Sequence, residues 1–408
     1  MRVMLATVIT LLHFSDYHSH AVPSYSEDRA DQGGIARAIG YMKGQQGALI
    51  FSGGDMMNRG APAWSDEYKC AEWSWFNGVV DAMALGNHDA DYGQDELVRC
   101  RKSVTYPILS ANTPGFEPYA VFQRQGVRIG AFATAGPDIE TARQTVRALR
   151  EKEHVDVVVY IGHEHREDDE RLARAVQGID LIFGTHSHIK QALTKIDGTQ
   201  TYFISPFQYL TYVSRVQLTI GDHRVTKARG ELVRIDKRIR EDQSVAKRVR
   251  TMQKALEQQH PDLFRPIGRL QHALTQDELG QRTVEVMAAA TDADAALSTT
   301  SSFRQPLPSG TLTEELLRNA MPYDNEIVLC TMSGAQLQRV LAFAESKRGT
   351  DAFAYVARPA SIESDKSYKV AAADFLANGP YREVFDCEKT KSGKRVREEV
   401  RRRLTASP

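Results

Sequence analysis

Residues 84–93 (ALGNHDADYG) place an amide, an imidazole and carboxylates close together, directly after a glycine that is expected to end a strand. The residues of interest are Asn87, His88 and Asp91. Burying such a polar cluster costs free energy unless the side chains are paired or bind an ion. An asparagine oxygen can ligate a metal, and a histidine oriented by a carboxylate can transfer a proton. The stretch therefore suggests one corner of a catalytic centre, provided that other segments supply the remaining groups.

Four further segments have the same character, namely FSDYHSH (14–20), GGDMMNRG (53–60), GHEH (162–165) and GTHSH (184–188). Taken singly, each is an ordinary polar loop. Together they carry imidazoles and carboxylates, the side chains that zinc, iron, manganese and cobalt prefer in proteins. Five such segments in one chain are not expected by accident. The ligand-type residues are Asp16, His18, Asp55, Asn87, His163, His186 and His188.

Seven ligand-type residues are too many for one tetrahedral zinc and suit two divalent cations that share a bridging carboxylate. Two such cations clamp the attacking and leaving oxygens of a phosphoryl displacement and lower the pKa of a bridging water. His88 is suited to protonate the departing alkoxide, with Asp91 holding its other ring nitrogen. The ligand set accepts Mn, Zn, Fe or Co and does not choose among them.

Short apolar runs must position these side chains, and most of them end in Gly, Asp or His. Amphipathic segments at 34–45 and 141–153 alternate with the runs and predict helices. Strands buried on both faces and separated by helices indicate an α/β sheet with parallel character, whose functional loops gather where the strands end. We therefore expect the five polar segments at one sheet edge. The predicted strands are 7–14, 48–54, 79–85, 127–134, 155–163 and 179–186.

The second half of the chain predicts a connecting helix and a separate mixed α/β region. Charged residues at helical spacing indicate a helix over 234–260. The region beyond it is large enough to bury its own core. We expect a catalytic domain over 1–230, a connecting helix over 231–261 and a second domain over 262–408. In that domain the predicted helices are 278–290, 313–321 and 334–346, and the predicted strands are 293–299, 325–333 and 367–375.

The charge balance narrows the possible partners. Lysine and arginine together number 52, as do aspartate and glutamate, so no net field attracts a polyanion and nucleic acid is not an expected partner. The basic segment 388–403 is expected to be a solvated helical end or a frayed tail, with nucleic-acid binding through it as an alternative. No apolar run is long enough to span a membrane, and residues 3–12 are interpreted mostly as a first buried strand rather than a signal peptide.

The four cysteines form no CxxC pair, so neither a zinc knuckle nor a redox motif is indicated. Free thiols are expected, although a disulfide between Cys70 and Cys100 stays open as an alternative. The oligomeric state cannot be inferred from these residues.

The order SDYHSH, GGDMMN, GNHDADYG, GHEH and GTHSH resembles the calcineurin-like metallophosphoesterases, and within them the bacterial 5'-nucleotidase branch. The resemblance covers about the first 210 residues and implies a four-layer α/β/β/α domain. It implies that Asp16, His18 and His188 hold one metal and that Asn87, His163 and His186 hold the other, with Asp55 bridging. It also implies that His88 and Asp91 form the catalytic dyad. His20, Glu164 and His165 match no ligand position and are treated as bystanders.

The second region resembles the C-terminal nucleotide-binding domain of that family. On this match Arg304 contacts phosphate, and Phe353 and Phe375 are candidate clamps for a base, while an ordinary surface arginine and two core phenylalanines are the alternatives. The chain departs from the family pattern at STTSSFR (298–304) and GPYREVF (379–385). Stacking contributes about 1–3 kcal/mol per base, so a weakened clamp is expected to loosen nucleotide selectivity and leave hydrolysis intact.

We therefore expect a phosphoesterase with two divalent metal ions that hydrolyses a small phosphate ester, in the first instance a nucleotide. The alternatives are the same core acting on UDP-sugars, 2',3'-cyclic nucleotides or a sulfur substrate of the thiosulfohydrolase kind, and an inert metal-binding protein. The resemblance suggests a periplasmic or extracellular location, which the N-terminal residues do not support with a convincing signal peptide.

Overall fold

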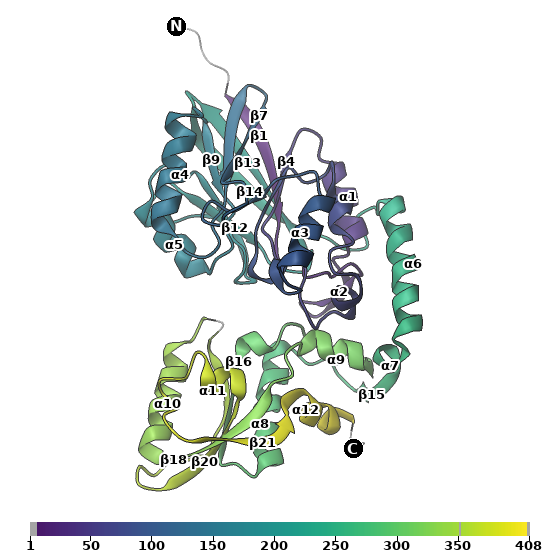
Figure 1. The fold of residues 1–408 in the computed structure, drawn as a ribbon, viewed down its shortest axis with the longest axis vertical. Coiled ribbons are helices and arrows are strands. Elements are labelled where there is room, and N and C mark those ends of the chain that lie inside the picture. Colours follow the sequence, from purple (N-terminus) through teal and green to yellow (C-terminus); the bar gives the residue numbers. More distant parts are fainter. Residues whose placement is uncertain (1–5, 351, 406–408) are drawn as a thin grey trace. The chain divides into compact units, whose positions relative to one another are not determined.

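The computed structural model describes residues 6–350 and 352–405, and the chain divides into two compact units (Figure 1). The first unit comprises the chain up to Ser24 together with Asp31–Leu256. The second comprises Tyr25–Ala30 and the chain from Glu257 onward. Among the described residues, no helix is both long enough and apolar enough to cross a membrane.

Two mixed six-stranded sheets form the centre of the first unit. In the first sheet, in the order β14-β13-β1-β4-β5-β6, strands β1, β4, β5 and β6 run parallel and β13 is antiparallel to β1. Its strands are β1 (Thr7–Phe14), β4 (Leu49–Ser52), β5 (Ala82–Ala84), β6 (Ile108–Leu109), β13 (Tyr212–Gly221) and β14 (Arg224–Arg234).

In the second sheet, in the order β11-β12-β10-β9-β8-β7, the four central strands run parallel and both edge strands are antiparallel to their neighbours. Its strands are β7 (Tyr119–Arg124), β8 (Val127–Phe132), β9 (Val157–Tyr160), β10 (Leu181–Phe183), β11 (Lys190–Lys195) and β12 (Tyr202–Pro206). A separate small hairpin is formed by β2 (Ser24–Ser26) and β3 (Arg29–Gln32).

One apolar core lies between the two sheets, and further cores lie under the helices. Ile9 and Leu11 of β1 belong to the cluster that also contains Val157, Val159 and Phe183 of the second sheet. The alternate side chains of the second sheet pack against α4 (Ile139–Glu151) and α5 (Arg166–Ala175). Figure 1 shows these helices on one side of the paired sheets, with α1 (Ile35–Lys43) and α3 (Gln94–Ser103) on the other. The first unit is thus the four-layer α/β/β/α arrangement that the resemblance implied.

Two features of the first unit differ from the sequence prediction. The ligand-bearing strands were expected in one sheet, but β1, β4 and β5 belong to the first sheet whereas β9 and β10 belong to the second. The helix predicted over 234–260 begins only at Gln243 as α6 (Gln243–Gln259), since Arg234 ends the edge strand β14 and residues 235–242 form turns and loop. The other predicted strands and helices are present, with bounds that differ by a few residues.

The second unit is built on a five-stranded sheet in the order β19-β16-β20-β18-β21, against which α8 and α10 pack. Its core is a separate apolar cluster that includes Leu297, Val328, Leu337 and Val370. The strands are β16 (Ala295–Thr299), β18 (Glu326–Ser333), β19 (Ala354–Ala357), β20 (Ser367–Ala373) and β21 (Lys389–Arg395), with a small sheet of β15 (Pro266–Leu270) and β17 (Gly310–Thr313). The helices are α7 (Pro261–Phe264), α8 (Gln276–Thr291), α9 (Glu314–Ala320), α10 (Gly334–Ser346), α11 (Asp374–Asn378) and α12 (Val396–Thr405), with the short 3₁₀ turn η3 (Thr300–Ser302).

The basic C-terminal segment is part of this fold. Lys389–Arg395 forms β21, which pairs with β18. Val396 and Val400 of α12 are buried in the core. The expected helical end is present as α12, with exposed charged residues at 401–403, but the frayed-tail alternative was wrong and residues 389–395 form a strand instead.

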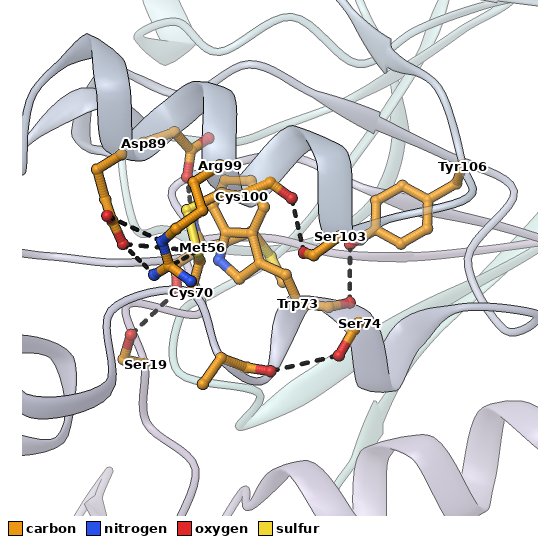
Figure 2. The surroundings of a disulfide bond; sticks show 12 residues. Ser19, Met56, Cys70, Trp73, Ser74, Asp89, Arg99, Cys100, Ser103 and Tyr106 are labelled. Carbon is orange, nitrogen blue, oxygen red and sulfur yellow. Dashed lines mark hydrogen bonds and ion pairs between the residues drawn. A yellow bond between two sulfur atoms is a disulfide. The ribbon is translucent and has the colours of Figure 1, made fainter.

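The expectation of free thiols was also wrong. Cys70 is bonded to Cys100, with Cα atoms 5.7 Å apart, and Cys330 is bonded to Cys387, with Cα atoms 6.0 Å apart. The first bridge joins α3 to the segment between α2 (Ala63–Tyr68) and the 3₁₀ turn η1 (Trp73–Phe76). Figure 2 shows it among Trp73, Arg99 and Tyr106.

Candidate metal centre

The five polar segments follow the carboxyl ends of β1, β4, β5, β9 and β10. The first two are joined by backbone hydrogen bonds, from Asp16 N to Gly54 O at 3.2 Å and from His18 N to Asp55 O at 2.9 Å. The fifth joins them through His186 N, which donates to Asp16 Oδ2 at 3.1 Å. Loops from both sheets are thus tied into one cluster.

Asp16, His18 and His188 form a first group of ligand-type atoms that lie within 4.8 Å of one another. The Nε2 atoms of His18 and His188 are 3.2 Å apart, and His188 Nε2 is 3.3 Å from Asp16 Oδ1. Two ligands of one tetrahedral ion, each about 2.1 Å from it, lie about 3.4 Å apart. The spacing of these atoms therefore matches ligands that share a cation.

Asp55, His163 and His186 form a second group within the same limit. Asp55 lies between the two groups: its Oδ2 is 3.0 Å from His163 Nε2 and 3.7 Å from His18 Nε2. Asp16, Asp55 and His163 are buried, whereas His186 and His188 are partly exposed. One side of the cluster is therefore buried, whereas the side that carries His186 and His188 is accessible to solvent.

The contacts of His163 are those expected of a histidine that ligates a metal ion. His163 Nδ1 is 2.7 Å from the Gly53 carbonyl oxygen, which can only accept a proton. In a neutral ring the Nε2 lone pair then faces the Asp55 carboxylate, and Nε2 is buried without a hydrogen-bond partner among the described residues. A carbonyl that fixes one ring nitrogen while the other faces the site is the usual arrangement of a metal-ligating histidine. The residues present therefore fit a metal ion.

The pKa shifts of His163 and Asp55 also indicate a site for a cation. Burial lowers the pKa of His163, but the Asp55 and Asp16 carboxylates and the Gly53 carbonyl together outweigh burial and raise it to about 10. Burial opposes ionisation of Asp55, yet His163 and His18 bring its pKa well below the usual value. The cluster therefore attracts positive charge to the space between these side chains, and a divalent cation supplies it there.

The backbone of the cluster is unusual. Five of the six grouped residues have left-handed φ angles, between 46° and 54°, the exception being His163. Asp and His tolerate this region better than most residues, but such angles persist only where the surroundings hold them. Gly86 is one of these supports, because a Cβ atom there would lie 2.2 Å from Asp55 N and from Asp55 Oδ1. The residues with these angles are Asp16, His18, Asp55, His186 and His188.

His88 and Asp91 form the pair that the sequence predicted, with Nδ1 and Oδ2 2.8 Å apart. Both lie at η2 (Asn87–Ala90) and its C-terminal end, and the His88 ring centroid is 5.3 Å from that of His18. The backbone N–H of His88 donates to Asp55 Oδ1 at 2.8 Å. Asn87 begins this turn and is exposed.

Sequence analysis did not single out Asp89, which stabilises the backbone of the cluster through hydrogen bonds. It is fully buried, and it accepts hydrogen bonds from the backbone N–H groups of Met56 at 2.8 Å, Gly86 at 2.8 Å and Asp55 at 3.2 Å. Burial raises its pKa to about 7 against these hydrogen bonds. A second acid inside GNHDADYG was the available signal, but only the structure shows which acid orients His88 and which holds the backbone.

His20 is also closer to the centre than the sequence indicated. Its ring stacks on Tyr209, with centroids 3.7 Å apart, and its Nδ1 is 2.9 Å from the His18 carbonyl oxygen. Tyr209 N donates to the Asp16 carbonyl oxygen at 2.8 Å. The segment after β12 therefore packs against the first ligand loop. Glu164 is buried and accepts a hydrogen bond from Thr134.

The three predicted substrate contacts lie in the second unit. Arg304 Nη2 donates to the Tyr323 hydroxyl at 3.0 Å. Phe353 is partly buried and lines a cavity of about 530 Å³ together with Tyr355 and Arg348. Phe375, on α11, is 55% exposed, so it is not a core residue.

Two family models match the chain. The model described as calcineurin-like phosphoesterase matches residues 9–190, and the model described as 5'-nucleotidase, C-terminal domain, matches residues 259–363. The four-layer fold and its polar cluster, together with these matches, define a metal-dependent phosphoester hydrolase. The chain belongs to the calcineurin-like phosphoesterases of the 5'-nucleotidase family.

Individual relatives agree with this assignment. The chain is 23% identical to Protein UshA of Yersinia enterocolitica, over 91% of this chain and 85% of that protein. It is 24% identical to a 5'-nucleotidase of Vibrio cholerae, over 81% and 74% respectively. Among solved structures it is similar to a 5'-nucleotidase precursor from Thermus thermophilus, with a TM-score of 0.81, 20% identity and coverage of 98% and 96% of the two chains.

Proposed function

We propose that the first unit holds two divalent cations and that the protein hydrolyses the phosphate ester of a nucleotide. In this proposal Asp16, His18 and His188 hold one cation, Asn87, His163 and His186 hold the other, and Asp55 contacts both. The observation that carries it is the position of Asp55 Oδ2 between His18 Nε2 and His163 Nε2. Asn87, which is exposed, would contribute its side-chain oxygen to the second cation.

When bound, such a pair of cations positions the ester and makes water a stronger nucleophile at neutral pH. The protein's own residues deal with the leaving group. Water adds its oxygen to phosphorus, and the bond between phosphorus and the ester oxygen breaks. In the protonated state His88 gives a proton to the departing oxygen, and the proton lost by the attacking water restores that state. Asp91, 2.8 Å from His88 Nδ1, orients the ring and stabilises its charged form.

The second unit supplies the substrate contacts of the proposal, with Arg304 on a phosphate oxygen and Phe353 and Phe375 against the base. The exposure of Phe375 and the cavity beside Phe353 support this role, since an apolar ring left at a surface is available for stacking. UDP-sugars, 2',3'-cyclic nucleotides and a sulfur ester remain the competing substrates. A solved sulfate thiohydrolase has a similar fold, with a TM-score of 0.78 and 18% identity.

Elemental analysis combined with a substrate panel tests the proposal. We expect about two equivalents of Mn, Zn, Fe or Co per chain, and fewer in His163→Ala. His154→Ala, which removes an exposed histidine outside the cluster, is the matched control and retains both equivalents. The panel contains nucleoside monophosphates, a UDP-sugar, a 2',3'-cyclic nucleotide, a thiosulfonate ester and p-nitrophenyl phosphate. Hydrolysis of the aryl phosphate without hydrolysis of any nucleotide would exclude the nucleotide substrate, and metal-loaded protein inert on the whole panel would indicate a binding protein.

A further inference from the structure

The loops that carry His163 and His186 follow two neighbouring strands whose pairing stops before either histidine. β9 and β10 are parallel, and the last pair in their register is Tyr160 with Ile182. Both histidines lie beyond this pair, where the hydrogen bonds between the two strands no longer fix the separation of the chain segments. Other contacts must therefore hold the two loops together.

The Thr185 hydroxyl makes the first of these contacts. It donates to the carbonyl oxygen of Gly162 at 2.8 Å and accepts a hydrogen bond from the backbone N–H of Glu164 at 3.2 Å. Because Gly162 and Glu164 are the chain neighbours of His163, one side chain contacts the backbone on both sides of that residue. Thr185 directly precedes His186 and is 2% exposed. A single buried hydroxyl thus links the two histidines of the second ligand group.

The methyl group of Thr185 lies against the loop that follows β4. A Cβ atom on Gly53 would lie 2.5 Å from Thr185 Cγ2, so the two residues are in direct contact. The Gly53 carbonyl oxygen is the group that lies 2.7 Å from His163 Nδ1. The hydroxyl of Thr185 therefore contacts the backbone beside His163, and its methyl group contacts the residue that orients the imidazole ring.

Ser187 makes a second connection of this kind from its position between His186 and His188. Its hydroxyl accepts a hydrogen bond from the backbone N–H of Arg166 at 2.8 Å. Arg166 is the first residue of α5, where a backbone N–H has no partner within the helix. The N–H of Ser187 donates to the Thr185 carbonyl oxygen, which closes a short turn around His186. His186 has a φ angle of 54°, and a residue in this region keeps its conformation only where its surroundings hold it.

We propose that Thr185, assisted by Ser187, is a positioning residue that holds His163 and His186 at the separation needed to bind one cation. The inference rests on the proposed two-metal centre and adds residues that are not ligands and take no part in the proposed chemistry. Without the Thr185 hydroxyl, a buried carbonyl and a buried N–H lose their partner, which is costly enough to shift the backbone around His163. Because outer partners of metal ligands typically contribute about 10- to 100-fold to metal affinity, we expect the dissociation constant of that cation to rise about tenfold.

Thr185→Val tests the role of the hydroxyl, because valine keeps the shape of threonine but cannot form the two hydrogen bonds. Thr201→Val is the matched control. Thr201 is buried like Thr185, and its hydroxyl donates to the Ile179 carbonyl oxygen at 2.8 Å, but this contact lies at the amino end of β10, opposite the ligands. Thr185→Ser keeps the hydroxyl and is the conservative variant, which is expected to bind metal much as wild type does.

The measurement is calorimetric titration of metal-free, full-length protein with Mn²⁺, followed by the visible absorption spectrum of the Co²⁺-loaded protein. Wild type and Thr201→Val are expected to bind two equivalents with the same pair of dissociation constants. In Thr185→Val one of these constants rises about tenfold. The Co²⁺ spectrum of this variant is also expected to change, since that spectrum reports ligand geometry.

Ser187→Ala provides a second variant in case Thr185→Val folds poorly. It is expected to raise the same dissociation constant by a smaller factor, because Ser187 and Arg166 are only partly buried and water can reach the freed N–H. If wild type binds two cations and both variants match it, or if Thr201→Val weakens binding as much as Thr185→Val, the inference is wrong and the proposed function stands. If wild type fails to bind two cations, the two-metal proposal is wrong, and the inference falls with it.

Discussion

The dependence of His88 variants on the leaving group tests the proposed chemistry most directly. In His88→Ala the imidazole and its 2.8 Å contact with Asp91 Oδ2 are lost, whereas the six residues of the two ligand groups stay in place. A positioned general acid contributes about 10²- to 10⁴-fold to rate, which corresponds to about 3–5 kcal/mol of barrier. We therefore expect kcat on a nucleoside 5'-monophosphate to fall by about 10³-fold.

An aryl phosphate provides the contrast. The alkoxide of a ribose is a poor leaving group and needs a proton, whereas p-nitrophenolate is stable enough to leave without one. The kcat of the same variant on p-nitrophenyl phosphate is therefore expected to fall by about tenfold or less. Asp91→Asn, which keeps the side-chain size but removes the charge that stabilises the protonated ring, is expected to show a smaller loss with the same preference for the alkyl ester.

The assay is steady-state phosphate release from both substrates, with the metal content of each variant measured in parallel. The kcat ratio of the two substrates is the decisive quantity, because a fall in metal content lowers both rates alike. Equal losses on the alkyl and aryl esters at unchanged metal content would refute the assignment of His88 as proton donor.

Further predictions follow from the same contacts. Asp55→Ala is expected to lower the measured content of both cations and abolish turnover, because Asp55 lies between the two ligand groups; loss of only one equivalent would contradict bridging. Replacing both Cys70 and Cys100 by serine is expected to lower the free energy of unfolding by about 3–4 kcal/mol, from the entropy of a closed loop with a sequence separation of 30, as measured by urea denaturation. Phe375→Ala is expected to raise KM for nucleotides and leave KM for p-nitrophenyl phosphate unchanged, and equal changes for both substrates would remove Phe375 from the site. Because the pKa of Glu72 is raised from 4.5 to about 7 in the folded protein, its contribution to stability falls as pH rises through that interval. Between pH 4.5 and 7 the free energy of unfolding of the metal-free wild type should therefore fall by about 3 kcal/mol more than that of Glu72→Gln, as measured by urea denaturation. An equal pH dependence of the two proteins would contradict the raised pKa.

The ligand-type residues that cluster in the structure were accessible to sequence reasoning because their signal is local. A buried parallel strand ends in a polar residue or glycine, and the side chain that follows it lies at the sheet edge, as Asp16 does after β1 and His163 does shortly after β9. The bounds of β1, Thr7–Phe14, were predicted correctly since the LLHF end of the strand is buried on both faces. The pairing of strands into two sheets has no such local signal, because it depends on contacts between residues far apart in the chain.

Two of the strands that sequence analysis did not predict share a cause. Both β14 and β21 are edge strands of their sheets, and both carry several lysines or arginines with little buried surface. Charged side chains on an edge strand discourage pairing with other chains, but they also remove the alternation of apolar residues by which a strand is recognised. Sequence analysis therefore assigned no strand to 224–234, the end of which it included in the connecting helix, and it interpreted 388–403 as a helical end or a frayed tail.

The two buried acids Asp89 and Glu72 show why part of the centre had to await the structure. Neither is a metal-ligand candidate, yet Asp89 accepts a hydrogen bond from the backbone N–H of Asp55, and Glu72 is fully buried just before η1, whose Phe76 packs against Tyr17. A loop with consecutive left-handed residues does not keep that shape unaided, so the free energy that orders it has to come from contacts made by other segments. A cation that binds such a preordered loop does not have to supply this ordering itself. In the proposed centre, the affinity for a cation is therefore expected to depend partly on residues that do not ligate it, and their positions follow from tertiary packing rather than from a motif.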